Sequence, residues 1–199
     1  MTDPWLAPVT LQSAAVKLVL SDPSHAGDLA EASRDGALDG LWYTTVPAPE
    51  AVPAEIDRRL GLFAKGAMLP FTVVDPATGK AIGMTTYMNV DAVNKRVEIG
   101  STWYRKSAQR TGVNTAAKLL LLTHAFERMD CIAVEFRTHF MNRQSRQAIE
   151  RLGAKLDGVL RAHMVMANGT LRDTCVYSII RAEWPAVKAN LEWKLAQSR

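Results

Sequence analysis

The stretch Gln109-Arg110-Thr111-Gly112-Val113-Asn114-Thr115 lies where a predicted strand, 95–104, gives way to a predicted long helix, 113–129. Backbone N–H groups at the start of a helix have no partner within the helix, and the helix dipole adds positive character there. These two effects together form a seat for a diphosphate. Gly112 would let the backbone approach such an anion closely.

Lys106 and Arg110 bring positive charge to the same loop. One glycine in a basic loop is weak evidence, because ordinary strand-to-helix connections often have this composition. The loop alone therefore leaves two interpretations open, a phosphate seat and a plain connection.

Short β-like runs alternate with helical runs along the rest of the chain, which indicates an α/β or α+β fold. The sequence predicts strands at 11–20, 71–74, 81–88, 95–104, 131–137, 156–166 and 171–180. It predicts helices at 22–33, 53–65, 113–129, 142–152 and 183–196, with a short helix or turn at 35–43.

The composition is that of a globular protein, with 199 residues, 48% apolar residues and 22% charged residues. We expect one domain over 1–199. Cys131 and Cys175 match no metal or redox spacing, so we expect free thiols in a reducing compartment. We find no secretory signal and no long apolar run, and we therefore expect a cytoplasmic protein that does not enter a membrane.

Three motifs in order extend the argument beyond the loop. Val97-Glu98-Ile99-Gly100 precedes it, the loop has the form Gln109-x-x-Gly112-x-Asn114, and the segment 142–154 begins Asn142-Arg143-Gln144-Ser145 and ends Leu152-Gly153-Ala154. With these motifs the chain resembles the GCN5-related N-acetyltransferase (GNAT) family, in particular its RimJ/RimL-like branch. The family loop ends in Gly or Ala where this chain has Asn114, a residue that tolerates left-handed backbone better than most.

The resemblance implies a mixed, mostly antiparallel sheet of six to seven strands, flanked by helices, whose central parallel pair splays apart. That pair would be 95–104 and 132–137. The resemblance also implies acetyl-CoA as co-substrate and no metal. The cofactor-binding residues that it implies are Trp103 and Tyr104 through their backbones, Asn142, and the loop residues Gln109, Arg110, Thr111, Gly112, Val113, Asn114 and Thr115.

Glu98 is the candidate general base, because transfer to an amine needs the amine neutral and a lysine-type amine has a pKa of about 10.4. Alternation along the strand places Glu98, Gly100 and Thr102 on one face. A surface glutamate, or one paired with a nearby arginine, is the plain alternative.

Ser145 is the candidate hydrogen-bond donor to the leaving thiolate, because it shares a helix face with Ala148, Ile149 and Leu152. Tyr177 is the alternative donor. Asn142 also fits a helix N-cap, and Ser145 could satisfy local backbone instead.

Arg161, His163 and Arg172 could line the acceptor site, although surface or packing roles are the simpler interpretation. Trp42 is a candidate for the entrance of the acceptor site.

The resemblance points to direct acetyl transfer to an amine, either a protein N-terminus or a small molecule. A non-catalytic acyl-CoA-binding or sensing module, and a transferase of another acyl group, remain alternatives. Because the net charge of +4 is mild and the basic residues are dispersed, we expect no nucleic-acid partner. The sequence leaves a homodimer open.

Overall fold

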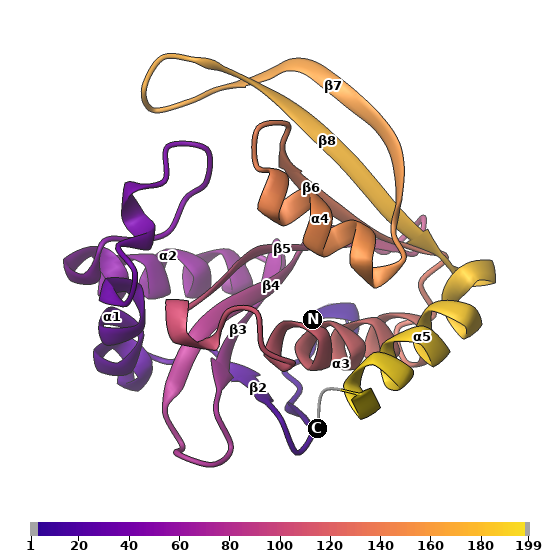
Figure 1. The fold of residues 1–199 in the computed structure, drawn as a ribbon, viewed down its shortest axis with the longest axis horizontal. Coiled ribbons are helices and arrows are strands. Elements are labelled where there is room, and N and C mark those ends of the chain that lie inside the picture. The colour runs from indigo at the N-terminus through magenta and orange to yellow at the C-terminus, as the bar shows by residue number, and fades with distance from the viewer. Residues whose placement is uncertain (1–3, 198–199) are drawn as a thin grey trace.

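The computed structural model describes residues 4–197, which form an eight-stranded sheet flanked by helices (Figure 1). Its strands are β1 Leu11–Gln12, β2 Lys17–Leu20, β3 Met68–Val74, β4 Ala81–Asp91, β5 Arg96–Tyr104, β6 Ala133–His139, β7 Lys155–Val165 and β8 Leu171–Ile180. They lie in the order β1-β2-β3-β4-β5-β6-β8-β7, and the β5–β6 neighbours alone are parallel.

The helices are α1 Ala26–Arg34, α2 Val52–Ala64, α3 Val113–Glu127, α4 Arg143–Leu152 and α5 Trp184–Gln197. Short 3₁₀ turns occur at Pro4–Leu6, Pro23–His25, Leu38–Gly40, Pro49–Ala51, Lys106–Ala108 and Arg181–Glu183. Among residues 4–197, no helix is long and apolar enough to cross a membrane.

The predicted mixed sheet with a parallel pair is confirmed, but the expected six to seven strands are too few. The predicted strand 11–20 is in fact a small hairpin, β1 and β2, closed by a turn in which the Ser13 N–H donates to the Val16 carbonyl. Small residues at Ser13-Ala14-Ala15 form this turn without the glycine or proline that would have signalled it.

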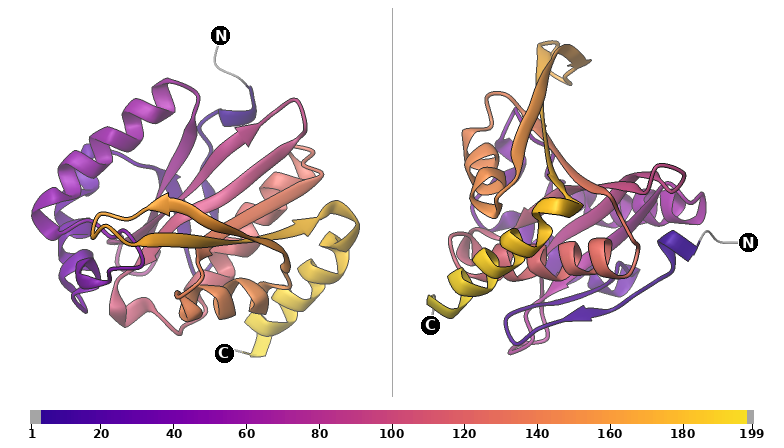
Figure 2. Two further views of the ribbon diagram at one scale, coloured as in Figure 1. Left: turned by 90° about the horizontal axis from the view of Figure 1, so that it is seen from above. Right: turned by 90° about the vertical axis from the view of Figure 1, so that its right-hand side faces the viewer.

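Two apolar layers cover the two faces of the sheet (Figure 2). On one face α1 and α2 pack through Leu29 and Ile56 against Met84 of β4 and Trp103 of β5. On the other face α3, α4 and α5 pack against the larger core, whose fully buried members include Leu121, Phe136, Tyr177 and Leu191. Helices thus cover both faces of the N-terminal half of the sheet.

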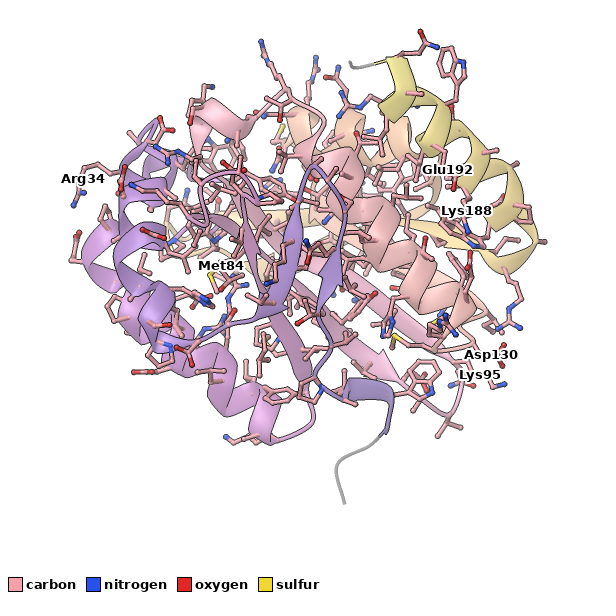
Figure 3. The ribbon with its side chains drawn as sticks, turned by 90° about the horizontal axis from the view of Figure 1, so that it is seen from below. Arg34, Met84, Lys95, Asp130, Lys188 and Glu192 are labelled. Atoms are coloured by element: carbon pink, nitrogen blue, oxygen red, sulfur yellow. The ribbon has the colours of Figure 1, made fainter. Side chains whose placement is uncertain are left out.

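The parallel pair β5–β6 is joined over only three positions, Arg96↔Ala133, Val97↔Val134 and Glu98↔Glu135. Beyond Glu98 the two strands have no further pairing, so the expected splay is confirmed. The closed end is reinforced by an Ile132 N–H bond to the Lys95 carbonyl and by the Lys95–Asp130 ion pair at 2.6 Å, which Figure 3 shows at the edge of the molecule.

A β-bulge at Ser101 interrupts β5 just beyond the last parallel pairing. Ser101 has a φ of 47°, and the register against β4 shifts between Met84 and Thr86. Arg59 of α2 is buried beside it, and its guanidinium donates to Thr86 Oγ1 at 2.9 Å and to the Ser101 carbonyl at 3.3 Å. Glu55 compensates the Arg59 charge at 2.7 Å, so the bulge is held by a buried, paired cation.

Lys118 of α3 holds the bulge from the opposite face. Its Nζ donates to Thr102 Oγ1 at 2.8 Å and to Thr85 Oγ1 at 3.2 Å. Thr102 therefore faces α3, and its predicted placement on the same face as Glu98 is wrong. The bulge reverses the alternation of side chains after Gly100. Lys118 is 5% exposed and has no ion pair among the described residues, and burial lowers its pKa to about 7.

We expect Lys118→Met to remove a pH dependence of stability. The unfolded chain keeps this proton up to a pKa of about 10.4, whereas the folded chain loses it near 7, so the wild type gains stability as pH rises between these values. The variant should therefore be more stable than wild type near pH 7, with an advantage that shrinks toward pH 10. Urea unfolding at several pH values measures this.

Lys80→Met is the matched control, because Lys80 is half exposed in a surface ion pair with Glu31. Parallel stability profiles for wild type and Lys118→Met between pH 7 and 10 would contradict the assignment of a neutral buried amine.

Candidate active site

The start of α3 presents a group of free backbone amides. Within residues 4–197, the N–H groups of Gly112, Asn114 and Thr115 donate to no acceptor, while the Val113 N–H donates to Thr111 Oγ1 at 3.3 Å. The Thr111 hydroxyl in turn donates to the Ala108 carbonyl at 2.7 Å and closes the loop. Free amides at the positive end of a 15-residue helix form an anion seat.

The loop obtains its curvature at Arg110, which has a φ of 61°. Asn114 lies within the first turn of α3, so the Asn in place of a small residue needs no left-handed backbone. Gly112 has an ordinary helical φ of −70°, and a Cβ there would only touch Leu195 at 3.6 Å. The close approach of a ligand to Gly112 stays a prediction.

Gln109 ties the loop to its neighbours. Its Nε2 donates to the Tyr104 carbonyl at 3.0 Å, and its Oε1 accepts from Gln144 Nε2 of α4 at 3.3 Å. The loop, the end of β5 and the start of α4 are thereby connected through one side chain. The Tyr104 carbonyl is thus already engaged, whereas the predicted backbone contacts of Trp103 and Tyr104 with a ligand stay untested.

Two hollows flank the loop. One, of about 460 Å³, is lined by the loop itself and by Arg110, Arg151, Lys194 and the exposed ring of Trp193. The other, of about 400 Å³, lies on the opposite flank and includes Lys80 and Arg105. Both hollows carry positive side chains, which suits a ligand that bears several phosphates.

Glu98 lies at the last position where β5 and β6 pair, and it is 5% exposed. Its Oε2 accepts from Asn89 Nδ2 at 2.7 Å and lies 3.5 Å from Arg137 Nε. Burial raises the pKa of Glu98 above its usual value, against the lowering by Asn89 and Arg137. A buried carboxylate with a raised pKa at the opening of two strands is a better proton acceptor than an exposed glutamate.

A network of ion pairs extends from Glu98 to β6. Arg137 bridges Glu98 and Glu135, and Glu135 Oε1 also accepts from Arg96 at 2.6 Å. Sequence reasoning missed Asn89, Glu135 and Arg137. The alternation of Glu135 and Arg137 in the predicted strand 131–137 was the available signal, because it places charged side chains together on one face.

Helix α4 begins as predicted. Asn142 is its N-cap, with Oδ1 accepting the Ser145 N–H at 3.0 Å, and Gly153 ends it with a φ of 103°. Ser145 is half-buried, and its hydroxyl has no partner among the described residues. That hydroxyl is therefore available to a ligand.

Tyr177 is differently placed. Its hydroxyl donates to Glu150 Oε1 at 2.7 Å and accepts from Arg146 Nε at 3.1 Å, both on α4. Tyr177 pairs with Phe136, whose neighbour Glu135 pairs with Glu98, so Tyr177 and Glu98 point to opposite faces of the sheet. Burial raises the pKa of the Tyr177 phenol, which makes it a poorer acid.

The remaining acceptor-site candidates divide between surface and interior. Arg161 is 82% exposed and pairs with Asp173, and His163 contacts Thr174 Oγ1. Arg172 is half-buried and donates to Thr174 Oγ1. Trp42 packs edge-on against His139. In the part of the chain that the structure describes, no group of three His, Cys, Asp or Glu side chains is arranged to hold a metal ion.

Comparisons with known proteins bear on this geometry. The chain is 34% identical over 110 residues to YdaF of Bacillus subtilis (strain 168), a protein named for ribosomal N-acetyltransferase activity, and the match spans 55% of this chain and 59% of YdaF. A GCN5-related N-acetyltransferase structure from Brucella melitensis has a TM-score of 0.81 and 29% identity, over 92% of this chain and 84% of that one.

The fold also matches Mycobacterium smegmatis RimJ, solved with CoA-disulfide, with a TM-score of 0.77 at 21% identity over 94% of this chain and 93% of that one. This match confirms the RimJ/RimL-like resemblance at the level of the fold. The family model for an acetyltransferase (GNAT) domain matches residues 16–155, from β2 through the free amides of α3 to the end of α4. By that match the chain belongs to the GCN5-related N-acetyltransferase family.

Proposed function

We propose that this chain is a single-domain N-acetyltransferase, over 1–199, that moves an acetyl group from acetyl-CoA directly to an amine. The observation that carries the proposal is that three structural features occur together at β5 and directly after it. A buried carboxylate lies at Glu98, the pairing of β5 and β6 ends there, and the free amides of α3 follow the far end of β5.

The residues present fit coenzyme A. The free amides of Gly112, Asn114 and Thr115 hold the diphosphate, with Arg110 beside them. From Ile99 to Tyr104 the β6 side of β5 has no strand partner among the described residues, so its backbone, apart from the Tyr104 carbonyl that Gln109 engages, can bind the pantetheine amides. When bound, acetyl-CoA supplies an activated acyl group as a thioester.

Glu98 acts as the general base, through a water molecule, and takes the proton of the attacking amine. Its raised pKa brings its basicity closer to that of the amine than an exposed glutamate would be. Asn89 and Arg137 fix the orientation of the carboxylate through its Oε2. Its Oε1, which lies over Gly100, has no hydrogen-bond partner among residues 4–197 and is available to the water.

Ser145 donates to the leaving thiolate, and Tyr177 does not. The Ser145 hydroxyl is unengaged, whereas the Tyr177 hydroxyl is committed to Glu150 and Arg146. Ser145 lies on α4, on the sheet face opposite Glu98. Thiolate donor and base therefore approach the gap between β5 and β6 from its two sides.

A protein N-terminal amine is the acceptor we favour, because YdaF is named as a ribosomal N-acetyltransferase and the RimL structure with a similar fold is named for an L7/L12 α-N-acetyltransferase. The two free, buried cysteines support a reducing compartment, the cytoplasm.

An assay of thiol release from acetyl-CoA, with N-terminal peptides and small amines as acceptors, tests the proposal. Binding of acetyl-CoA without acetylation of any amine would favour a sensing module instead.

Gly112→Trp should abolish acetyl-CoA binding, because an indole at this position fills the space before the free amides. Isothermal calorimetry with acetyl-CoA measures the loss. Gly61→Trp is the control, since Gly61 is exposed on α2 with nothing within 4 Å of an added Cβ. Wild-type affinity in a folded Gly112→Trp protein would place the diphosphate elsewhere.

Glu98→Gln should lower kcat/KM by a factor of about 10² to 10⁴ while the Kd for acetyl-CoA changes little. In the wild type, kcat/KM should fall as pH drops through an apparent pKa above the ordinary 4.5 of glutamate, and the variant should lack that limb. Thiol release across pH measures both. Glu192→Gln on the exposed side of α5 is the control, and a pH profile unchanged by Glu98→Gln would remove Glu98 from the role of base.

Ser145→Ala should lower kcat by about tenfold with unchanged acetyl-CoA affinity, since one hydrogen bond to the thiolate is lost. The N-cap survives, because Asn142 accepts from the Ser145 backbone and not from its hydroxyl. Tyr177→Phe is the companion variant and should keep its turnover. The opposite pattern would assign the donor role to Tyr177.

A further inference from the structure

The sheet face that carries Glu98 continues across β6 and β8 without a helix on it. On this face β6 presents Glu135, Arg137 and His139, and the register pairs Glu135 with Ser178 and His139 with Thr174 of β8. Helices α1 and α2 cover the same face only over β3, β4 and β5 (Figures 1 and 2). Trp42 packs on this face against His139, and the rest of the polar face over β6 and β8 is where an acceptor can approach Glu98.

Arg172 is the unpaired charge of this face. The other two arginines there are matched, Arg96 by Glu135 and Arg137 by both Glu135 and Glu98. Arg172 forms no ion pair within residues 4–197, and its recorded hydrogen bond is from Nε to Thr174 Oγ1 at 2.9 Å. Burial lowers the pKa of Arg172, and the nearby charge of Glu98 opposes that shift, so the two groups lie close enough to interact.

His139 adds a second donor without an acceptor. The side chain is 4% exposed, and Nδ1 accepts the Met141 N–H at 3.1 Å, so the neutral ring carries its hydrogen on Nε2. That Nε2 is buried and has no partner in the described part of the chain. Thr174 lies directly across from His139 and also holds Arg172, which brings the two donors together.

A half-buried guanidinium without a carboxylate and a buried N–H without an acceptor are both costly to leave unmatched. Both costs are removed if an anionic oxygen binds between them, because guanidinium groups bind carboxylates in a planar, two-bonded geometry. Glu98, on the same face, takes the amine. The face therefore offers a site for an amine next to a site for an anion.

We propose that Arg172, together with His139, binds a carboxylate of the acceptor, so that the enzyme prefers amines that carry a carboxylate close to the reactive nitrogen. This inference rests on the proposed N-acetyltransferase activity. The carboxylate can be the side chain of an N-terminal Asp or Glu, or the α-carboxylate of a free amino acid. Both sources present the same chemistry to Arg172.

The test compares acceptors of equal size that differ by one charge. In the peptide arm these are Asp-Ala-Ala amide and Asn-Ala-Ala amide, and in the amino-acid arm glutamine and its α-amide. For wild type we expect kcat/KM to favour the carboxylate member of at least one pair by about tenfold or more. The arm that shows the preference identifies the source of the carboxylate.

Arg172→Gln should bring that ratio close to one. Because the same acceptors are used with both proteins, differences in amine basicity cancel. Arg172→Lys should keep part of the preference, since it keeps the charge but not the planar fork. Arg161→Gln is the matched control, an exposed arginine on the neighbouring strand, and should keep the whole preference.

Equal kcat/KM for the charged and neutral members in both arms would overturn the inference, and so would a preference that persists in Arg172→Gln. Either result with active enzyme leaves the proposed function standing. Absence of acetyl-CoA binding, or of acetylation of any amine, would instead remove the proposed function and this inference with it. Thermal unfolding and the acetyl-CoA Kd of each variant confirm that fold and cofactor site are intact.

Discussion

The termination of backbone pairing between β5 and β6 is the constraint on which the rest of the structure depends. Parallel strands in a sheet usually pair along their whole length, because unpaired backbone groups within a protein are costly. Here pairing stops after Glu98 and Glu135, and the chain is forced to open a gap in the middle of its sheet. Glu98 lies where the pairing ends, and the free amides of α3 follow the far end of β5.

Maintaining the gap requires β5 to be rigid where it has lost a neighbour. The bulge at Ser101 is held by Arg59 from one face and Lys118 from the other. A buried, paired cation and a buried amine are an expensive means of support. Their cost is understandable at this position, because a strand with a free edge would otherwise shift in register against β4.

Much of the fold was predictable, because α3 has a strong apolar pattern, α4 has a capping residue at each end, and the Asn168-Gly169 turn marks the last hairpin. The loop before α3 was predictable for the same local reasons. The hairpin at 11–20 and the bulge at Ser101 were not, since Ser13 and Ser101 carry no turn signal. Arg59, Asn89 and Arg137 were missed because their roles arise from packing between distant segments, which no local pattern encodes.

The position of the gap between the two sheet faces has a consequence for ligand design. The amides of α3 and Ser145 belong to one side, whereas Glu98 and Arg172 belong to the other. A nucleotide analogue and an acceptor analogue would occupy separate compartments and could be bound together. If both ligands bind as proposed, a single compound that joins the two analogues would gain affinity from effective concentration, without any contact that the two halves do not already make.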